Sequence, residues 1–151
     1  MIDLEKLLIL KAVTLFKQMP DDLLLQLVMS VVKEERIQPG QPILEEGVKN
    51  TNIYIIVSGR VKIHNKEQFI SELSEREIFG ELSALSFDFP VSCVSAITEC
   101  LVLKINSISL YEIMNYDIGL AKGIIFALCQ RTKSISSQLQ QLLTEKNSKG
   151  L

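Results

Sequence analysis

The chain has 151 residues, a formal net charge of −2 and 47% hydrophobic residues. This length fits one domain with its own core, and the apolar content excludes a disordered or fibrous protein. The small negative charge provides no overall field that attracts nucleic acid, and no stretch reaches the ~20 apolar residues of a membrane-spanning helix.

The cysteines and the N-terminal stretch both indicate the same cellular compartment. Cys93, Cys100 and Cys129 are odd in number and have no CxxC spacing, so we interpret them as reduced thiols and not as a disulfide or metal set. The N-terminal stretch lacks the basic segment and the uninterrupted apolar segment of a signal peptide. The sequence therefore predicts a cytoplasmic protein.

Two helices are expected at the start of the chain. Apolar residues recur at steps of three and four over residues 3–19, which predicts a helix with one buried face. The residues of that face are Leu4, Leu8, Ala12 and Leu15. Pro20 ends this helix, and Asp21 and Asp22 begin a second one, because negative charge is favoured at a helix N-terminus. The buried face of the second helix is expected to be Leu24, Leu27, Val28 and Val31.

Between residues 37 and 105 the sequence pattern predicts short strands and turns in place of helices. Pro39-Gly40 and Ser58-Gly59 are turn signals, and residues 53–57 are rich in β-branched and aromatic residues. The expected strands are 43–44, 53–57, 61–64, 69–73, the alternating segment 91–97, and 101–105. Many short strands at this spacing predict an antiparallel, closed or sandwiched β structure, and the order helices, strands, helices predicts the α+β class.

Helix returns after residue 105. Asn106 or Ser107 can cap a short helix that ends at Met114, and Asp117 can cap a long one. The apolar stripe of the long helix is Leu120, Ile124, Leu128, Ile135, Leu139 and Leu142. Arg131 interrupts a strict heptad, so we interpret this helix as packed on its own domain, with a helical partner as the alternative. Residues 145–151 are expected to form a polar, fraying tail.

The stretch 78–97 carries the main functional signal. Gly80 permits a positive φ or a close approach of the backbone, and Glu81 stands where a helical turn would begin. A loop that leads into a helix start presents free backbone N–H groups, which suit an anion such as a phosphate.

Several short motifs follow one another at a specific spacing, namely Gly40-x-x-Ile43-x-x-x-Gly47, Tyr54-Ile55-Ile56-x-x-Gly59-x-Val61, Phe79-Gly80-Glu81 and Val94-Ser95-Ala96. Their order and spacing resemble the cyclic-nucleotide-binding domain family, of the cyclic-AMP-receptor and protein-kinase-A-regulatory-subunit type. The resemblance runs from about Leu10 to Thr132. It implies a jelly-roll β-barrel flanked by N-terminal helices and two C-terminal helices, with a nucleotide pocket inside. The domain would cover residues 1–144, with a helical part at 3–33, a β-roll at 35–105, C-terminal helices at 107–144, and the tail at 145–151.

The resemblance also implies a site. In the family, the glutamate that matches Glu81 accepts a hydrogen bond from the ribose 2′-hydroxyl, and the backbone around Gly80, Leu82 and Ser83 meets the cyclic phosphate. Small residues that line the phosphate match Ser92 and Cys93. The expected ligand-binding residues are Phe79, Gly80, Glu81, Leu82, Ser83, Pro90, Val91, Ser92 and Cys93.

One residue of the family pattern is missing. The arginine that pairs with the phosphate falls on Pro90 or Val91, depending on the anchor of the alignment, and no arginine occurs between Arg76 and Arg131. A charge-assisted hydrogen bond contributes roughly 1.5–3 kcal/mol, so its loss weakens phosphate binding by about one to two decades. Lys122 or Arg131 could swing over the pocket, but we interpret both as solvated helix residues.

Two functions fit these observations. The favoured one is a non-enzymatic regulatory or interaction module that binds cyclic AMP or cyclic GMP weakly or not at all, and that contacts a second copy or a partner protein through its last helix. The alternative is a working sensor of a cyclic nucleotide or another small anion that signals through the same helix.

The sequence lacks the residues that an enzyme, a metal-binding protein or a nucleic-acid-binding protein would need. His64 is the only histidine, so a cupin-type metal site cannot form, and no catalytic motif is present. We therefore expect no enzyme, no metal and no cofactor. No helix-turn-helix follows the last helix, so no nucleic acid partner is expected. Membrane insertion is not expected either, although the N-terminal pattern also resembles domains appended to some bacterial membrane transporters.

Overall fold

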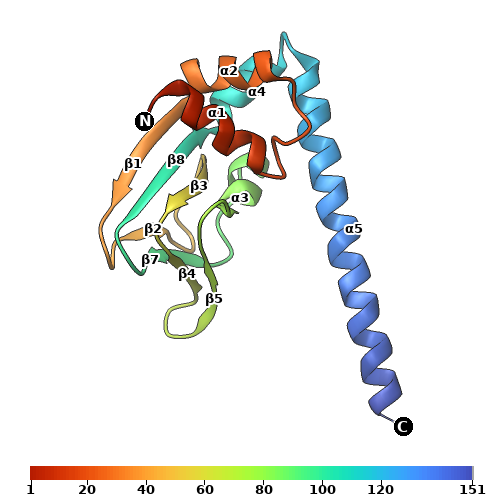
Figure 1. Ribbon diagram of the computed structural model, residues 1–151. Coiled ribbons are helices and arrows are strands. Elements are labelled where there is room, and N and C mark those ends of the chain that lie inside the picture. The colour runs from red at the N-terminus through yellow and green to blue at the C-terminus, as the bar shows by residue number, and fades with distance from the viewer. Residues whose placement is uncertain (151) are drawn as a thin grey trace.

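The computed structural model describes residues 1–150, and Figure 1 shows the N-terminal helices and the short C-terminal helix together at one end of a β-roll, from which the long last helix projects. The helices are α1 (Asp3–Ala12), α2 (Asp21–Ser30), α3 (Glu81–Ser86), α4 (Ser107–Met114) and α5 (Ile118–Lys149). The strands are β1 (Val32–Ile37), β2 (Pro42–Leu44), β3 (Asn52–Ser58), β4 (Val61–His64), β5 (Phe69–Leu73), β6 (Ile78–Phe79), β7 (Cys93–Ala96) and β8 (Cys100–Asn106). The elements confirm the α+β jelly-roll class.

The strands form two antiparallel sheets of four strands each, in the orders β1-β8-β3-β6 and β2-β7-β4-β5. In the first sheet, β8 pairs with β1 on one side and with β3 on the other, where Ile53 faces Ile105 and Ile55 faces Leu103. These four side chains are fully buried, so this pair of strands forms the centre of the fold.

Strand β3 is buried on both of its faces, because successive side chains of a strand point to opposite sides. Ile53 and Ile55 belong to a core that the first sheet shares with the helices, together with Phe16. Tyr54 and Ile56 belong to a second core between the two sheets. Burial on both sides explains why the sequence of β3 is a continuous apolar run and not an alternating one.

The expected helix over residues 3–19 is too long, and most of its predicted buried face is wrong. Helix α1 ends at Ala12, because Val13 has an extended backbone (φ −90°, ψ 130°), and residues 14–18 form turns. Leu4, Leu8 and Ala12 are exposed. Leu15 is buried as predicted, although it lies in the turns, and Leu10, which was not assigned to the face, is buried in the helix. The run Leu7-Leu8-Ile9-Leu10 places apolar side chains around most of the helix, so periodicity alone could not select the buried side.

Strand β1 was also missed. The expected helical part ran to residue 33, but α2 ends at Ser30 and β1 pairs with β8 from Val32 to Ile37. The charged residues between those two positions had indicated a break. They fit an edge strand instead, where charge discourages pairing with other chains. Ion pairs hold two of them, Glu35 to Lys104 at 3.2 Å and Arg36 to Glu99 at 3.2 Å.

Helix α5 begins as predicted and then leaves the domain. The Asp117 carboxylate accepts a hydrogen bond from the Gly119 N–H at 3.0 Å and caps the helix. Leu120 and Ile124 are buried, but every described residue after Arg131 is exposed, and the helix projects away from the β-roll (Figure 1). Packing on its own domain is therefore wrong for the second half of the helix.

The end of the chain also differs from the expected tail. Residues 145–149 continue helix α5, and only Leu151 of the predicted tail lies outside the described residues. Within residues 1–150, no helix is both long enough and apolar enough to cross a membrane.

Two glycines with positive φ allow a test of the β3–β4 turn. An added Cβ at Gly59 (φ +96°) would meet the Glu99 carbonyl oxygen and lie 2.8 Å from Cys100 Sγ, whereas at Gly40 (φ +82°) it would meet nothing within 4 Å. We expect Gly59→Ala to lower the free energy of unfolding by about 2–4 kcal/mol, through backbone strain and overpacking. Gly40→Ala should cost only the strain, about 1–2 kcal/mol. Urea unfolding measures both, and equal losses would contradict the packing argument.

Candidate functional site

The turn between β6 and α3 is held in one shape by Gly80 and Asn50. Gly80 has φ +82°, and an added Cβ would lie 2.8 Å from the Asn52 carbonyl oxygen, so only glycine fits here. Asn50 is buried, and its side-chain amide lies 2.9 Å from the Asn52 carbonyl oxygen, 3.1 Å from that of Gly80 and 3.1 Å from Ser83 Oγ. This amide ties the start of α3 to β3.

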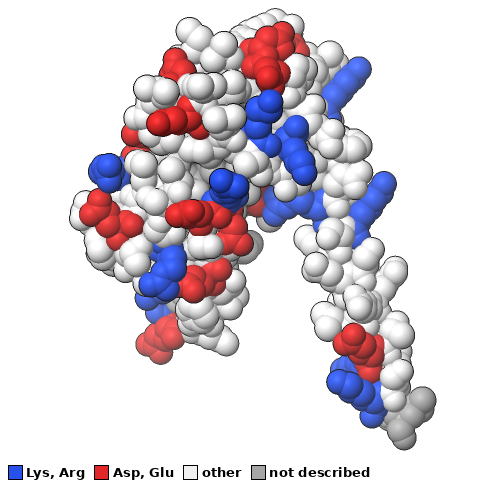
Figure 2. Space-filling model, viewed as in Figure 1, with Lys and Arg blue, Asp and Glu red and all other residues white. Residues whose placement is uncertain are grey.

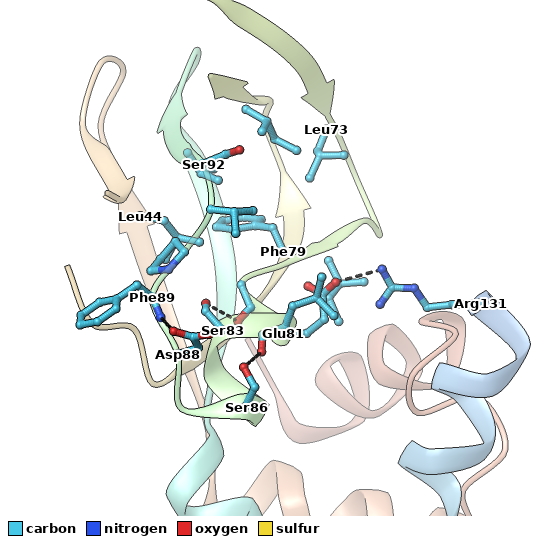
Figure 3. Close-up of a pocket in the computed structure, with 17 residues that line it drawn as sticks. Leu44, Leu73, Phe79, Glu81, Ser83, Ser86, Asp88, Phe89, Ser92 and Arg131 are labelled. Atoms are coloured by element: carbon cyan, nitrogen blue, oxygen red, sulfur yellow. Dashed lines mark hydrogen bonds and ion pairs between the residues drawn. The ribbon is translucent and has the colours of Figure 1, made fainter. Parts of the chain in front are cut away.

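A pocket lies between the inner face of the second sheet, the α3 turn and the loop that follows α3 (Figure 3). Its apolar wall consists of Leu44, Ile63, Leu73, Ile78, Phe79, Leu82, Phe89, Pro90, Val91 and Val94. Its polar and small residues are Gly80, Glu81, Ser83, Ser86, Asp88, Ser92 and Arg131.

All of the expected site residues line this pocket except Cys93. Cys93 precedes Val94 on β7, and because Val94 faces the pocket, its neighbour points to the other side of the sheet. Whether the remaining residues bind a ligand stays a prediction.

Sequence reasoning missed several pocket residues. Ile63 and Leu73 could have been found from the alternation of their strands, because the apolar positions face the interior. Asp88 sits in a loop where its side chain had no distinguishing signal. Asn50, which supports the turn from behind, had none either.

The interpretation of Arg131 as a solvated residue is wrong. Its Nη2 lies 3.0 Å from Glu81 Oε1, and the two side chains are 34% and 7% exposed (Figure 3). Arg131 follows the buried Ile124 by seven residues and the buried Ala127 by four, so it belongs to the same face of α5. That spacing was a usable signal. Lys122, in contrast, is exposed as expected.

The ion pair engages only one nitrogen of the Arg131 guanidinium and one oxygen of the Glu81 carboxylate. The Nη1 atom of Arg131 is buried and has no hydrogen-bond partner among the described residues. The carboxylate of Glu81, which the family resemblance assigned to a ribose hydroxyl, is therefore engaged by the protein itself.

The charge of the pocket does not favour a phosphate. Its lining contains the carboxylates of Glu81 and Asp88, and Arg131 is the single cation among the described lining residues. Pro90 is buried and Val91 is 87% exposed, and neither side chain can donate a hydrogen bond. The Ser83 hydroxyl is already bonded to Asn50 and to the Gly80 carbonyl oxygen.

Comparison with known proteins gives the family. Residues 34–117 match the cyclic nucleotide-binding domain family, which is more than half of the 151 residues. The chain belongs to the cyclic-nucleotide-binding domain family, and in related proteins this domain is regulatory.

The relatives include channels and kinases. Potassium channel AKT2 from Oryza sativa subsp. japonica is 33% identical over 112 residues, which are 70% of this chain and 13% of the channel. The cGMP-dependent protein kinase 2 of Homo sapiens is 31% identical over 85 residues, which are 52% of this chain and 11% of the kinase. The chain therefore matches only a small part of each relative.

Two solved structures share the fold. The regulatory domain of Toxoplasma gondii PKA with cAMP has a TM-score of 0.69 at 19% identity and covers 74% of this chain and 44% of that one. The regulatory subunit of a cAMP-independent protein kinase A from Trypanosoma brucei has a TM-score of 0.71 at 20% identity, with 92% and 48% covered.

The role of Asn50 can be tested by truncation. Asn50→Ala leaves the Gly80 carbonyl oxygen and the Ser83 hydroxyl without their buried amide donor, so we expect a loss of about 1–3 kcal/mol in the free energy of unfolding. Asn65→Ala, at an exposed asparagine in the β4–β5 turn, is the matched control and should change stability by less than about 0.5 kcal/mol. Urea unfolding of both variants measures the two free energies of unfolding. If Asn50→Ala loses no more free energy of unfolding than Asn65→Ala, the Asn50 amide does not stabilise the turn.

Proposed function

We propose that this chain is a non-enzymatic regulatory domain of the cyclic-nucleotide-binding family that binds cyclic AMP and cyclic GMP weakly or not at all. The proposal depends on one observation, namely that the pocket, over the described residues, has no unpaired cation to bind a phosphate. The family's phosphate-binding arginine is replaced by Pro90 or Val91, and the remaining cation, Arg131, is paired with Glu81.

The energetics support weak binding. A cyclic phosphate in this pocket would have no unpaired cation and would lie near the Asp88 carboxylate, which also lines the pocket. To recruit Arg131, it would have to leave Glu81 as a buried carboxylate without a partner, which is costly. The unpaired thiols of Cys93, Cys100 and Cys129 further support a reducing compartment, and on that ground we propose the cytoplasm.

A second candidate is a sensor of a small anion that signals through α5. It is favoured by one observation, namely that Arg131 lies on α5 and reaches the pocket. An anion that prefers one position of Arg131 would shift the position of the helix.

Calorimetry with cyclic AMP and cyclic GMP tests the first proposal. We expect no saturable heat below about 1 mM ligand, because the charge-assisted phosphate contact is absent. A dissociation constant near 1 μM would overturn the proposal and favour the sensor.

Restoring the cation should restore some affinity. We expect Pro90→Arg or Val91→Arg, whichever points at the phosphate, to strengthen binding of cyclic AMP by about one to two decades. Val48→Arg adds the same charge at an exposed position that does not line the pocket and is the control. If neither pocket variant exceeds this control, the missing arginine is not the cause of weak binding.

The projecting half of α5 is the interaction surface that we propose, and its partner is a second copy of the chain. On this half, Thr132 and Leu139 alternate with Ile135 and Leu142 at steps of three and four, which is the spacing of a two-stranded coiled-coil seam. Ile135, Leu139 and Leu142 are all exposed. Residues 134–144 carry no charge, so two copies would not repel each other there, and Figure 2 shows uncharged surface along this part of the helix.

Sedimentation at several concentrations measures this association. We expect Leu139→Glu to weaken the dimer at least about tenfold, because it removes buried apolar surface and sets two carboxylates face to face. Ser137→Glu places the same charge off the seam and should leave the association unchanged. A chain that stays monomeric at millimolar concentration would contradict the proposal.

A further inference from the structure

We infer that the pocket recognises a guanidinium group on an apolar stem, and that Arg131 fills it as an internal ligand. This inference rests on the proposed function, because it names a ligand class for a pocket that we propose binds cyclic nucleotides weakly or not at all. It assigns to the pocket a cationic ligand class, which is the opposite of a cyclic phosphate.

The first support is charge. The part of the pocket that the β-roll and its loops contribute, from Leu44 to Val94, contains two carboxylates and no cation. Glu81 is fixed on the first turn of α3 and is 7% exposed, so its carboxylate needs a positive partner from elsewhere. In this chain α5 supplies that partner.

The second support is hydrogen-bond geometry. A guanidinium group can donate two parallel hydrogen bonds to one carboxylate. Arg131 makes one contact, from Nη2 to Glu81 Oε1 at 3.0 Å, and its buried Nη1 finds no partner in the described chain. A guanidinium that is not tethered to α5 is free to turn and use both carboxylate oxygens.

The third support is the apolar lining of the same pocket. Leu82, Phe89 and Val91 line the same pocket and are all exposed. They offer apolar contact to an aliphatic stem of the kind that arginine itself carries. The guanidinium group, which pairs with the carboxylate, and the aliphatic stem, which contacts the apolar residues, together define the ligand class.

Displacement has a structural consequence for α5. Arg131 is the last residue of the helix that is partly buried, since residues 132–149 are all exposed. A competing guanidinium would therefore remove the outermost contact between α5 and the pocket. The ligand would act on the helix that carries the proposed dimer seam.

Chemical rescue tests the inference. Arg131→Ala removes the internal ligand, and we expect its Tm to fall by about 5 °C, because Glu81 is left buried without a partner. Ethylguanidinium, added up to about 20 mM, should raise the Tm of the variant saturably and leave the wild-type Tm unchanged. Arg131→Met, which keeps an apolar stem, is the second variant if the alanine variant does not fold.

Two controls make the outcome specific. Ethylammonium at the same concentration carries the same charge without the fork and should give no saturable rise. The double variant Glu81→Gln with Arg131→Ala should lose the rescue. An equal response to both cations, or rescue that survives in the double variant, would overturn the inference.

The same samples separate this inference from the function on which it rests. Cyclic AMP is titrated into the wild-type protein in parallel. Tight cyclic AMP binding would overturn the proposed function, whereas absent guanidinium rescue together with absent cyclic AMP binding would overturn only the guanidinium site.

Discussion

The buried carboxylate of Glu81 is the constraint on which the arrangement of the pocket depends. A carboxylate at the first turn of α3 that is largely buried requires compensation from a cation or from several donors. The wall of the β-roll provides neither, and the compensation comes from Arg131 on α5. The last helix is thus coupled to the pocket by electrostatics, in addition to the apolar packing of its first turns.

The pocket combines features of the family site with a cation that comes from the last helix. The fold has the glycine turn, its glutamate and the apolar interior, while the positions to which the family resemblance assigns the phosphate-binding arginine are the apolar residues Pro90 and Val91. The cation that lines the pocket in this chain is Arg131, which belongs to α5 and not to the loop. If this pocket binds cyclic nucleotides weakly or not at all, as we propose, the Glu81–Arg131 contact still links the pocket to the last helix.

Much of the fold could be predicted from the sequence because its strands and turns carry local signals. Strand β3 and the Gly80 turn were clear, since β-branched runs and positive-φ glycines are local features. The limits of α1 and β1 were not, because the apolar run of α1 has no preferred side and the charges of β1 resemble a loop. Arg131 was considered as a cation for the pocket but was interpreted as solvated, because its partner Glu81 is fifty residues away in sequence and only the folded chain brings the two together.

The straightness and length of α5 give the Glu81–Arg131 contact a mechanical meaning. A helix rises about 1.5 Å per residue, so the exposed part from Arg131 to Lys149 extends for about 27 Å beyond its last anchor. It acts as a lever whose fulcrum lies near the pocket. A tilt of about 10° at that fulcrum moves the far end by about 5 Å, roughly the rise of one helical turn. If the loss of the Glu81–Arg131 contact tilted the helix by that amount, the far end would move far enough to alter the register of whatever lies against it.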